Sequence, residues 1–330
     1  MEKRERLERT LAGEATDRAP IAVWRPFPGD DLRSADYVQA VVDFQLRYDW
    51  DLCMVAPPWS FAGGDYGLQE AWQGAPNGER VAVRRPIRRS LDWTDLRPAE
   101  PSKGELGRLA ETIAAVLDGL QMTGVPVVVG VLSPLTQAER LVGRELLIRH
   151  LRLRPDRLMT GLNTLTESTV RFLDSLRGAA VSGIVLVSEL ADCNVLSEPE
   201  YESFGLPGDS AVLTSAPKSV WLRIAYLAGA AVMTRLFARM PATVVAWDDR
   251  SSETDLAAGR SMWSGPILGG LDAELDLRAS TPAGIREAVR ASLHTMGNRR
   301  LIVGCGRPLP VTVPHGNLRA ARTAVERGTS

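Results

Sequence analysis

The sequence is poor in cysteine, with Cys53, Cys193 and Cys305 as the three examples in 330 residues. A scattered, odd-numbered set predicts no disulfide framework and fits a reducing compartment. No apolar run approaches the ~18 residues of a membrane-spanning helix, and the charged start MEKRERLERTLAGE lacks the apolar segment of a signal peptide. The net charge of −1 offers no field that would attract nucleic acid or an anionic membrane. We therefore expect a soluble cytoplasmic protein.

The motifs of several enzyme classes are missing as well. No CxxC, HxC or HExxH spacing occurs, so the sequence predicts neither a metal site nor a bound cofactor. Neither a GxSxG elbow nor a Walker-type phosphate loop is present. No glycine-rich turn follows the first β-like run, IAVW, which argues against an open nucleotide-binding sheet.

Short apolar runs alternate with longer amphipathic segments from end to end. Eight runs read as strands: 21–24, 52–56, 125–132, 183–189, 220–225, 243–247, 265–270 and 300–305. They are continuously apolar, as is typical of parallel strands buried on both faces. Between them, segments such as 105–121 and 155–176 repeat apolar residues at intervals of three and four, which predicts helices. The pattern predicts an α/β fold, a single (β/α)8 TIM barrel over residues 1–330.

The stretch from Pro57 to Pro101 is the main irregular region. It is rich in glycine and contains RVAVRRPI, which suggests a β-hairpin within a long loop. A long loop after the second strand of a barrel commonly covers the catalytic face, because that face is built from the loops at the strand ends.

Candidate site residues are found where the predicted strands end, since barrel chemistry collects there. These positions and the loop after strand two supply Trp24, Arg25, Trp59, Tyr66, Ser133, Glu189, Arg223, Tyr226, Trp247, Asp248, Asp249, Cys305 and Arg307. Arginines beside aromatic residues suit a ligand that bears carboxylates, because the guanidinium fork binds them in a bidentate manner.

Roles follow from residue type. Arg25 and Arg223 are expected to bind substrate carboxylates. Asp248, Asp249 and Glu189 are the expected proton carriers, because a carboxyl group in an apolar cleft has a raised pKa. Cys305 completes the catalytic set. The substrate-binding wall is expected to comprise Trp24, Trp59, Tyr66, Ser133, Tyr226 and Trp247. A plainer alternative stays open for each: tryptophan as packing, the aspartates as a helix cap, Cys305 as a small buried apolar residue.

Several segments, in order, resemble the uroporphyrinogen decarboxylase superfamily. They are RERLERTLAGEATDRAPIAVWR, VVVGVLSPLTQAERLVG, LSEPEYESFGLP and GGLDAELDLRASTPAGIREAVRASL. The resemblance implies a (β/α)8 barrel that forms a homodimer and has a cleft at the strand ends. One branch of the superfamily decarboxylates uroporphyrinogen without a cofactor. The other branch transfers methyl groups between a corrinoid protein and a zinc-bound thiol.

The sequence departs from both branches at the site. WRPFPGDD stands in place of the RQAGRY motif and leaves Arg25 as its arginine, while Pro58 lies near the position of an essential aspartate. Arg140 occupies the place of a tyrosine, and Cys305 that of a histidine, where it also fits the late cysteine ligand of the methyltransferases.

The resulting hypothesis is a decarboxylase-like lyase with an altered active site, acting on a small-molecule carboxylate substrate. Two alternatives remain. One is a corrinoid-dependent methyltransferase-like protein, although Arg223 and Ala225 stand where two zinc ligands would be. The other is a non-catalytic barrel that binds a ligand or partners an active homologue.

Overall fold

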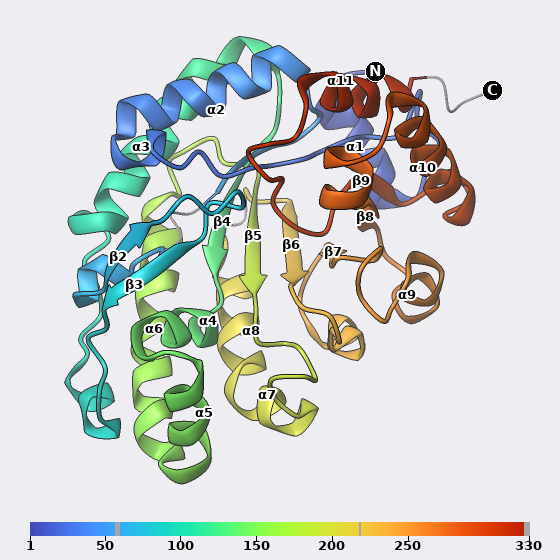
Figure 1. Cartoon of the computed structure of the whole chain (residues 1–330). Helices are drawn as coiled ribbons and strands as arrows, with labels where there is room; N and C mark the ends of the chain where they lie inside the picture. The colour runs from blue at the N-terminus through green and yellow to red at the C-terminus, as the bar shows by residue number, and fades with distance from the viewer. Residues whose placement is uncertain (57–59, 218, 327–330) are drawn as a thin grey trace.

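A computed structural model describes residues 1–56, 60–217 and 219–326 (Figure 1). Seven parallel strands form one curled sheet in the order β1-β4-β5-β6-β7-β8-β9. They are β1 (Cys53–Val55), β4 (Val127–Leu132), β5 (Gly183–Ser188), β6 (Leu222–Leu227), β7 (Val244–Ala246), β8 (Ile267–Leu271) and β9 (Leu301–Cys305). Figure 1 shows β4, β5 and β6 side by side and pointing the same way. The α/β barrel-type fold is confirmed, with strand regions close to seven of the eight predicted ones.

The predicted strand at 21–24 is wrong as a regular strand. Ile21 forms only an isolated parallel bridge with Val303. The amide N–H of Ile21 binds the Asp51 carboxylate at 2.8 Å instead of a strand carbonyl, so the ladder does not continue. The segment still lies between the two edge strands of the sheet, because Ala22 N donates to Val303 O and Asp51 N donates to Ile21 O, both at 2.9 Å.

Helices surround the sheet. They are α1 (Lys3–Ala12), α2 (Ser34–Tyr48), α3 (Gly104–Leu120), α4 (Pro134–Val142), α5 (Arg144–Leu153), α6 (Pro155–Ser175), α7 (Glu198–Phe204), α8 (Leu206–Ser215), α9 (Leu256–Met262), α10 (Pro282–Thr295) and α11 (His315–Ala324). The predicted helices at 105–121 and 155–176 match α3 and α6. In the part of the chain described, no helix is both long enough and apolar enough to cross a membrane.

Alternation along the strands divides the core into two layers. Val185, Ile224 and Ala246 belong to a buried cluster inside the barrel, whereas their neighbours Ile184, Ala225 and Val245 pack against the helices. This follows from the two-residue period of a strand, which sends successive side chains to opposite faces. Consequently, whether a residue near a strand end reaches the interior depends on its place in this alternation.

The predicted hairpin is present in the irregular region. Strands β2 (Gln69–Trp72) and β3 (Arg80–Arg84) pair antiparallel and form a separate two-stranded sheet, which stands apart from the main sheet in Figure 1. The connecting turn is attached to the barrel, because Val311 N donates to Pro76 O at 2.8 Å.

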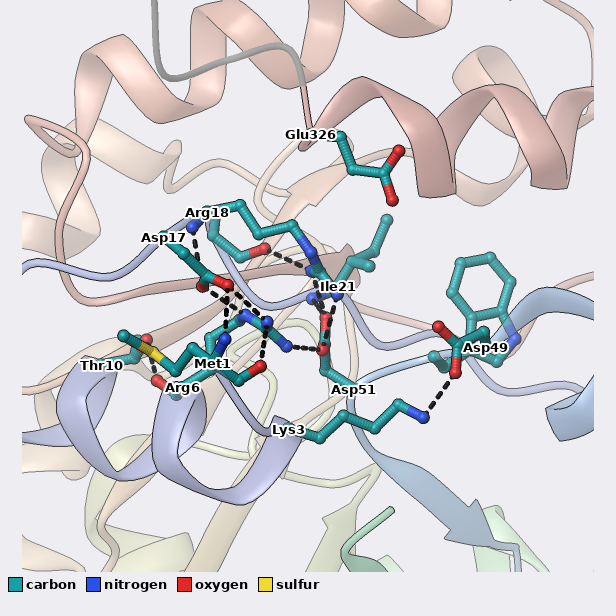
Figure 2. A network of polar contacts seen from close by, with 12 residues as sticks. Met1, Lys3, Arg6, Thr10, Asp17, Arg18, Ile21, Asp49, Asp51 and Glu326 are labelled. Atoms are coloured by element: carbon teal, nitrogen blue, oxygen red, sulfur yellow. Dashed lines mark hydrogen bonds and ion pairs between the residues drawn. The ribbon is translucent and has the colours of Figure 1, made fainter. Parts of the chain in front are cut away.

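The amino end of the barrel is closed by α1 and by a buried ion-pair network (Figure 2). Leu7 of α1 is fully buried in the same cluster as the barrel interior. Asp51, which is also fully buried, accepts hydrogen bonds from Arg6 Nη1 at 2.6 Å, from both terminal nitrogens of Arg18 at 2.6 and 2.9 Å, and from Ile21 N. Arg6 also binds Asp17 through two bonds of 2.8 Å. The network joins α1, the segment before Ile21 and the start of β1.

Candidate active site

A cavity of about 730 Å³ lies at the carboxyl ends of the strands. Residues at or just after the ends of β1, β4, β5, β6, β7 and β9 line it, including Ala56, Leu132, Glu189, Tyr226 and Asp248. The turn of the β2–β3 hairpin and the first turns of α3 complete the wall. The volume is within the range of small-molecule sites, which measure roughly 300–1,000 Å³.

Three polar side chains come from adjacent strands at the floor of this cavity. Tyr226 on β6 is in register with Val187 on β5 and Ala246 on β7. Glu189 and Asp248 follow these two partners by two residues, so the alternation directs both of them to the side of Tyr226. Trp24 packs edge-on against the Tyr226 ring, with 6.0 Å between the ring centroids. The result is a row of Glu189, Tyr226 and Asp248 beside an aromatic wall.

An arginine pairs with the carboxylate at each end of the row. Arg140, from α4, forms an ion pair with Glu189, and Arg307, just after β9, forms one with Asp248. The Asp248 side chain is 5% exposed and the Arg307 side chain 43% exposed, so this arginine reaches from the floor toward solvent. All four of these charged residues line the cavity.

Burial raises the pKa values of the three side chains in this row. Desolvation raises the pKa of Glu189 although Arg140 opposes the shift, and it raises the pKa of Asp248 although Arg307 opposes it. The pKa of the Tyr226 hydroxyl is also raised, first by desolvation and then by the charges of Glu189 and Asp248. Tyr226 therefore stays protonated at neutral pH, and the two carboxyl groups hold a proton more readily than exposed ones do.

The structure brings to the cavity four of the residues for which a role was predicted, Trp24, Glu189, Tyr226 and Asp248, together with the strand-end candidate Arg307. Trp59 lies outside the described residues.

The two arginines predicted to bind carboxylates do not line the cavity. Arg25 places its guanidinium carbon 4.9 Å from the ring centroid of Phe27 and 5.8 Å from that of Phe44, and burial lowers its pKa. Arg223 is the second residue of β6, at the amino end of the strand, where its N–H binds Thr243 Oγ1 at 2.8 Å. The predicted strand at 220–225 began and ended too early, which placed Arg223 at the wrong end of the barrel.

Three further predicted residues point into the helix layer or the sheet. The Trp247 ring packs against Phe237 and its Nε1 donates to Thr254 O at 2.7 Å. Cys305 belongs to the buried cluster between sheet and helices, where desolvation raises its thiol pKa. Asp249 accepts from Gly270 N at 2.8 Å, and burial raises its pKa to about 6. Each of these three residues is next in sequence to a residue that faces the barrel interior. The alternation of side chains along a strand therefore directs its own side chain away from the cavity.

Ser133 and Tyr66 lie away from the cavity wall as well. Ser133 precedes α4, is fully buried, and has its hydroxyl beside the buried Tyr201 and Asp209. Tyr66, in a short 3-10 turn (Gly63–Tyr66), hydrogen-bonds Ser168 of α6 at 2.5 Å. Both lie in the outer layer, outside the residues that line the cavity.

Several residues that line the cavity were not predicted to act there. Arg307 stood on the strand-end list but received no role, and Arg140 was noted only as a departure from the family pattern. Glu79 of the hairpin turn and Glu105 and Arg108 of α3 also line the wall. For Arg307 the position after a strand was a usable signal. The others reach the cavity through tertiary packing alone.

The donor set does not fit a zinc–thiolate centre. Among the described residues, no group of three or more His, Cys, Asp or Glu side chains is arranged to hold a metal ion. Cys305, the one match to a methyltransferase ligand, faces the helix layer.

Comparison with known proteins identifies the family. The sequence model described as uroporphyrinogen decarboxylase (URO-D) matches residues 74–328, which is most of the chain. The chain belongs to the uroporphyrinogen decarboxylase family. No protein of curated function is significantly similar to it in sequence.

Solved structures support the fold of the family. A methyltransferase from Methanosarcina mazei superposes with a TM-score of 0.87 at 15% identity, over 100% of both chains. A B12-independent methionine synthase from Shewanella sp. W3-18-1 gives a TM-score of 0.60 at 12% identity, over 94% of this chain and 92% of the synthase. At such low identity these likenesses show a shared fold, not a shared reaction.

Proposed function

We propose that the protein is a cofactor-independent carboxy-lyase acting on a carboxylate-bearing substrate. The observation that carries this proposal is the row of Glu189, Tyr226 and Asp248 at the cavity floor, with an arginine paired to the carboxylate at each end. Guanidinium groups bind substrate carboxylates, and a buried acid of raised pKa holds a transferable proton more readily than an exposed one does.

Arg307 is the proposed anchor for the substrate carboxylate. Its contacts with Asp248 run through Nε and Nη2. A guanidinium has five N–H donors, so donors remain for a second carboxylate. Its half-exposed side chain suits this role, because an incoming ligand replaces water there rather than breaking a sealed packing arrangement.

The proposed reaction breaks the bond between the carboxylate carbon and its neighbour. The electron pair of that bond stays on the neighbouring carbon, and CO₂ leaves. Asp248 then delivers its proton to that carbon, which balances the reaction. Tyr226, which stays protonated, donates a hydrogen bond to the reacting group, while its ring and that of Trp24 exclude water from the floor.

The test is CO₂ release from a panel that contains uroporphyrinogen III and smaller mono- and dicarboxylates. We expect release from at least one acid, and Arg307→Gln should lower kcat/KM for it about 100-fold, as expected for the loss of a charged group that touches the substrate. Arg290→Gln is the matched control, because Arg290 pairs with Glu287 on the outer surface. Wild-type kcat/KM in Arg307→Gln, or no release from any acid, would contradict the proposal.

The methyltransferase alternative has the fold likeness to the Methanosarcina mazei protein in its favour. It requires a zinc-bound thiol, and the direction of Cys305 does not support such a site. Metal analysis after zinc supplementation separates the two ideas: about one zinc per chain would favour the methyltransferase, because a catalytic zinc binds tightly through three protein ligands.

A further inference from the structure

We infer that the substrate carries a positively charged nitrogen near its carboxylate, so that its net charge is close to zero. This inference rests on the carboxylate-binding role proposed for Arg307. It differs from the polyanionic tetrapyrrole that the family resemblance implies, and it comes from the balance of charges on the cavity wall.

Carboxylates outnumber cations on this wall. Among the described lining residues, six carry a carboxyl group: Asp31, Glu79, Glu105, Glu189, Asp248 and Glu274. Without Asp248, the proposed proton donor, five remain as carboxylates. Three carry a guanidinium: Arg108, Arg140 and Arg307. A cavity of this composition favours a ligand that brings positive charge and disfavours one that brings several negative charges.

Each lining arginine already has a carboxylate partner in the same wall. Arg307 pairs with Asp248, Arg140 pairs with Glu189, and Arg108 lies 3.7 Å from Glu105. One substrate carboxylate can share the donors that Arg307 has left. A ligand with many carboxylates would leave most of them desolvated without a counter-charge, which is strongly unfavourable.

Among the described lining residues, Glu79 is the carboxylate that has no ion-pair partner. Asp31 pairs with Arg80 at 2.6 Å and Glu274 pairs with Arg278, so both are compensated. Within the part of the chain described, no lysine or arginine lies within 4.0 Å of the Glu79 carboxylate. Its charge is felt at Glu189, where it helps raise the pKa of that group. Glu79 is exposed and therefore presents to the cavity a negative charge that has no ion-pair partner among the described residues.

The fold holds Glu79 at the cavity. The preceding residue, Gly78, is buried with a φ of +76°, and a Cβ there would lie 2.5 Å from Pro26. Together with the Val311–Pro76 backbone bond and the Arg80–Asp31 pair, this contact attaches both sides of the turn to the barrel. These contacts fix the backbone of the turn beside the cavity, and the exposed Glu79 side chain extends from it at the cavity wall.

Aromatic rings add a second attraction for a cation. Trp24 and Tyr226 form an edge-on pair that lines the cavity, and Tyr37 lines it as well. Ring faces attract ammonium groups, most strongly where water is excluded. A positive nitrogen near the reacting carbon would also stabilise the electron pair that departing CO₂ leaves behind.

The experiment compares two acids of the same shape by isothermal titration calorimetry. 4-(Trimethylammonio)butanoate and 5,5-dimethylhexanoate differ only in a cationic nitrogen against a neutral carbon. We expect the wild-type protein to bind the ammonium acid about tenfold more tightly. Glu79→Gln should reduce that preference to within about twofold, whereas Glu111→Gln, which removes an exposed charge on α3 away from the cavity, should keep it.

Four outcomes would overturn the inference: equal binding of the two acids, an unchanged preference in Glu79→Gln, tighter binding of uroporphyrin than of the ammonium acid, or binding of neither acid. The Arg307→Gln variant distinguishes a failure of the charge inference from a failure of the proposed carboxylate site. If Arg307→Gln weakens both acids equally while the wild type shows no preference, only the charge inference fails. If Arg307→Gln leaves the binding of both acids unchanged, the carboxylate site itself is wrong.

Discussion

The two ends of the barrel use the same chemical pair, arginine with carboxylate, in opposite ways. At the amino end, Asp51 is sealed from solvent and binds Arg6, Arg18 and the backbone of Ile21 (Figure 2). At the carboxyl end, Arg307 pairs with Asp248 at the edge of a cavity and remains 43% exposed. A pair whose bonds are all made within the protein holds chain segments together. A pair that keeps donors and access to solvent can bind a ligand.

The difference matches the general division of labour in such barrels, where the amino face serves stability and the carboxyl face serves chemistry. Here the division has a specific physical basis. Removing one partner of a buried pair leaves an uncompensated charge in a medium of low dielectric constant, whereas water can solvate the remaining partner beside an open cavity.

The largest effect is expected at Asp51. Asp51→Asn leaves two arginines facing a neutral amide, so the free energy of unfolding should fall by about 3–5 kcal/mol. Urea denaturation followed by circular dichroism measures it. Asp174→Asn, at an exposed pair with Arg177, is the control and should change stability by less than about 0.5 kcal/mol. A similar loss in both variants would remove the distinction between sealed and open pairs.

A smaller, pH-dependent effect is expected at Asp249, a buried carboxylate near the cavity end. Burial raises its pKa from 3.8 to about 6 in the folded protein, so ionisation disfavours the folded state increasingly as the pH rises between those values. Asp249→Asn should therefore raise stability by about 3 kcal/mol at neutral pH and have little effect below about pH 4.

Melting temperatures across this pH range would test the prediction, with the exposed Asp118→Asn as a control that should show no such trend. A gain for Asp249→Asn that is equal at all pH values would show that the raised pKa is not its cause. Asn keeps the oxygen that accepts from Gly270 N, so this hydrogen bond survives in the variant.

The smallest effect on stability is expected at Arg307. Arg307→Gln should change the free energy of unfolding by less than about 1 kcal/mol, because half-exposed ion pairs contribute little. The same substitution at the buried Arg18 should be several times more destabilising. Chemical denaturation of the two variants side by side gives the direct comparison. Equal losses would mean that the cavity pair also holds the fold together.

Much of the fold was predictable, because continuous apolar runs and three-to-four-residue periodicity report burial directly. The strands at 127–132 and 183–188 and the helices α3 and α6 fall within one or two residues of the predicted segments. The strand at 21–24 failed because Asp51, distant along the chain, takes the N–H that a ladder would use. The site was predictable only in part: Glu189, Tyr226 and Asp248 were found from strand ends, whereas Arg223 was misplaced by a shift of two residues in β6.

The sequence by itself determined the barrel, the family resemblance and the strand-end positions of Glu189, Tyr226, Asp248 and Arg307. These are four of the five polar residues that form the row or pair with it, and Arg140 is the fifth. The four strand-end positions follow from local patterns, which a single strand and its end contain in full. Only the tertiary structure decided that Arg140 and Arg307 replace Arg25 and Arg223 at the cavity, that Cys305 and Trp247 turn away, and that Glu79 reaches the wall. The direction of a side chain at a strand end depends on register and on the loops packed above it, and contacts between residues distant in the sequence set both.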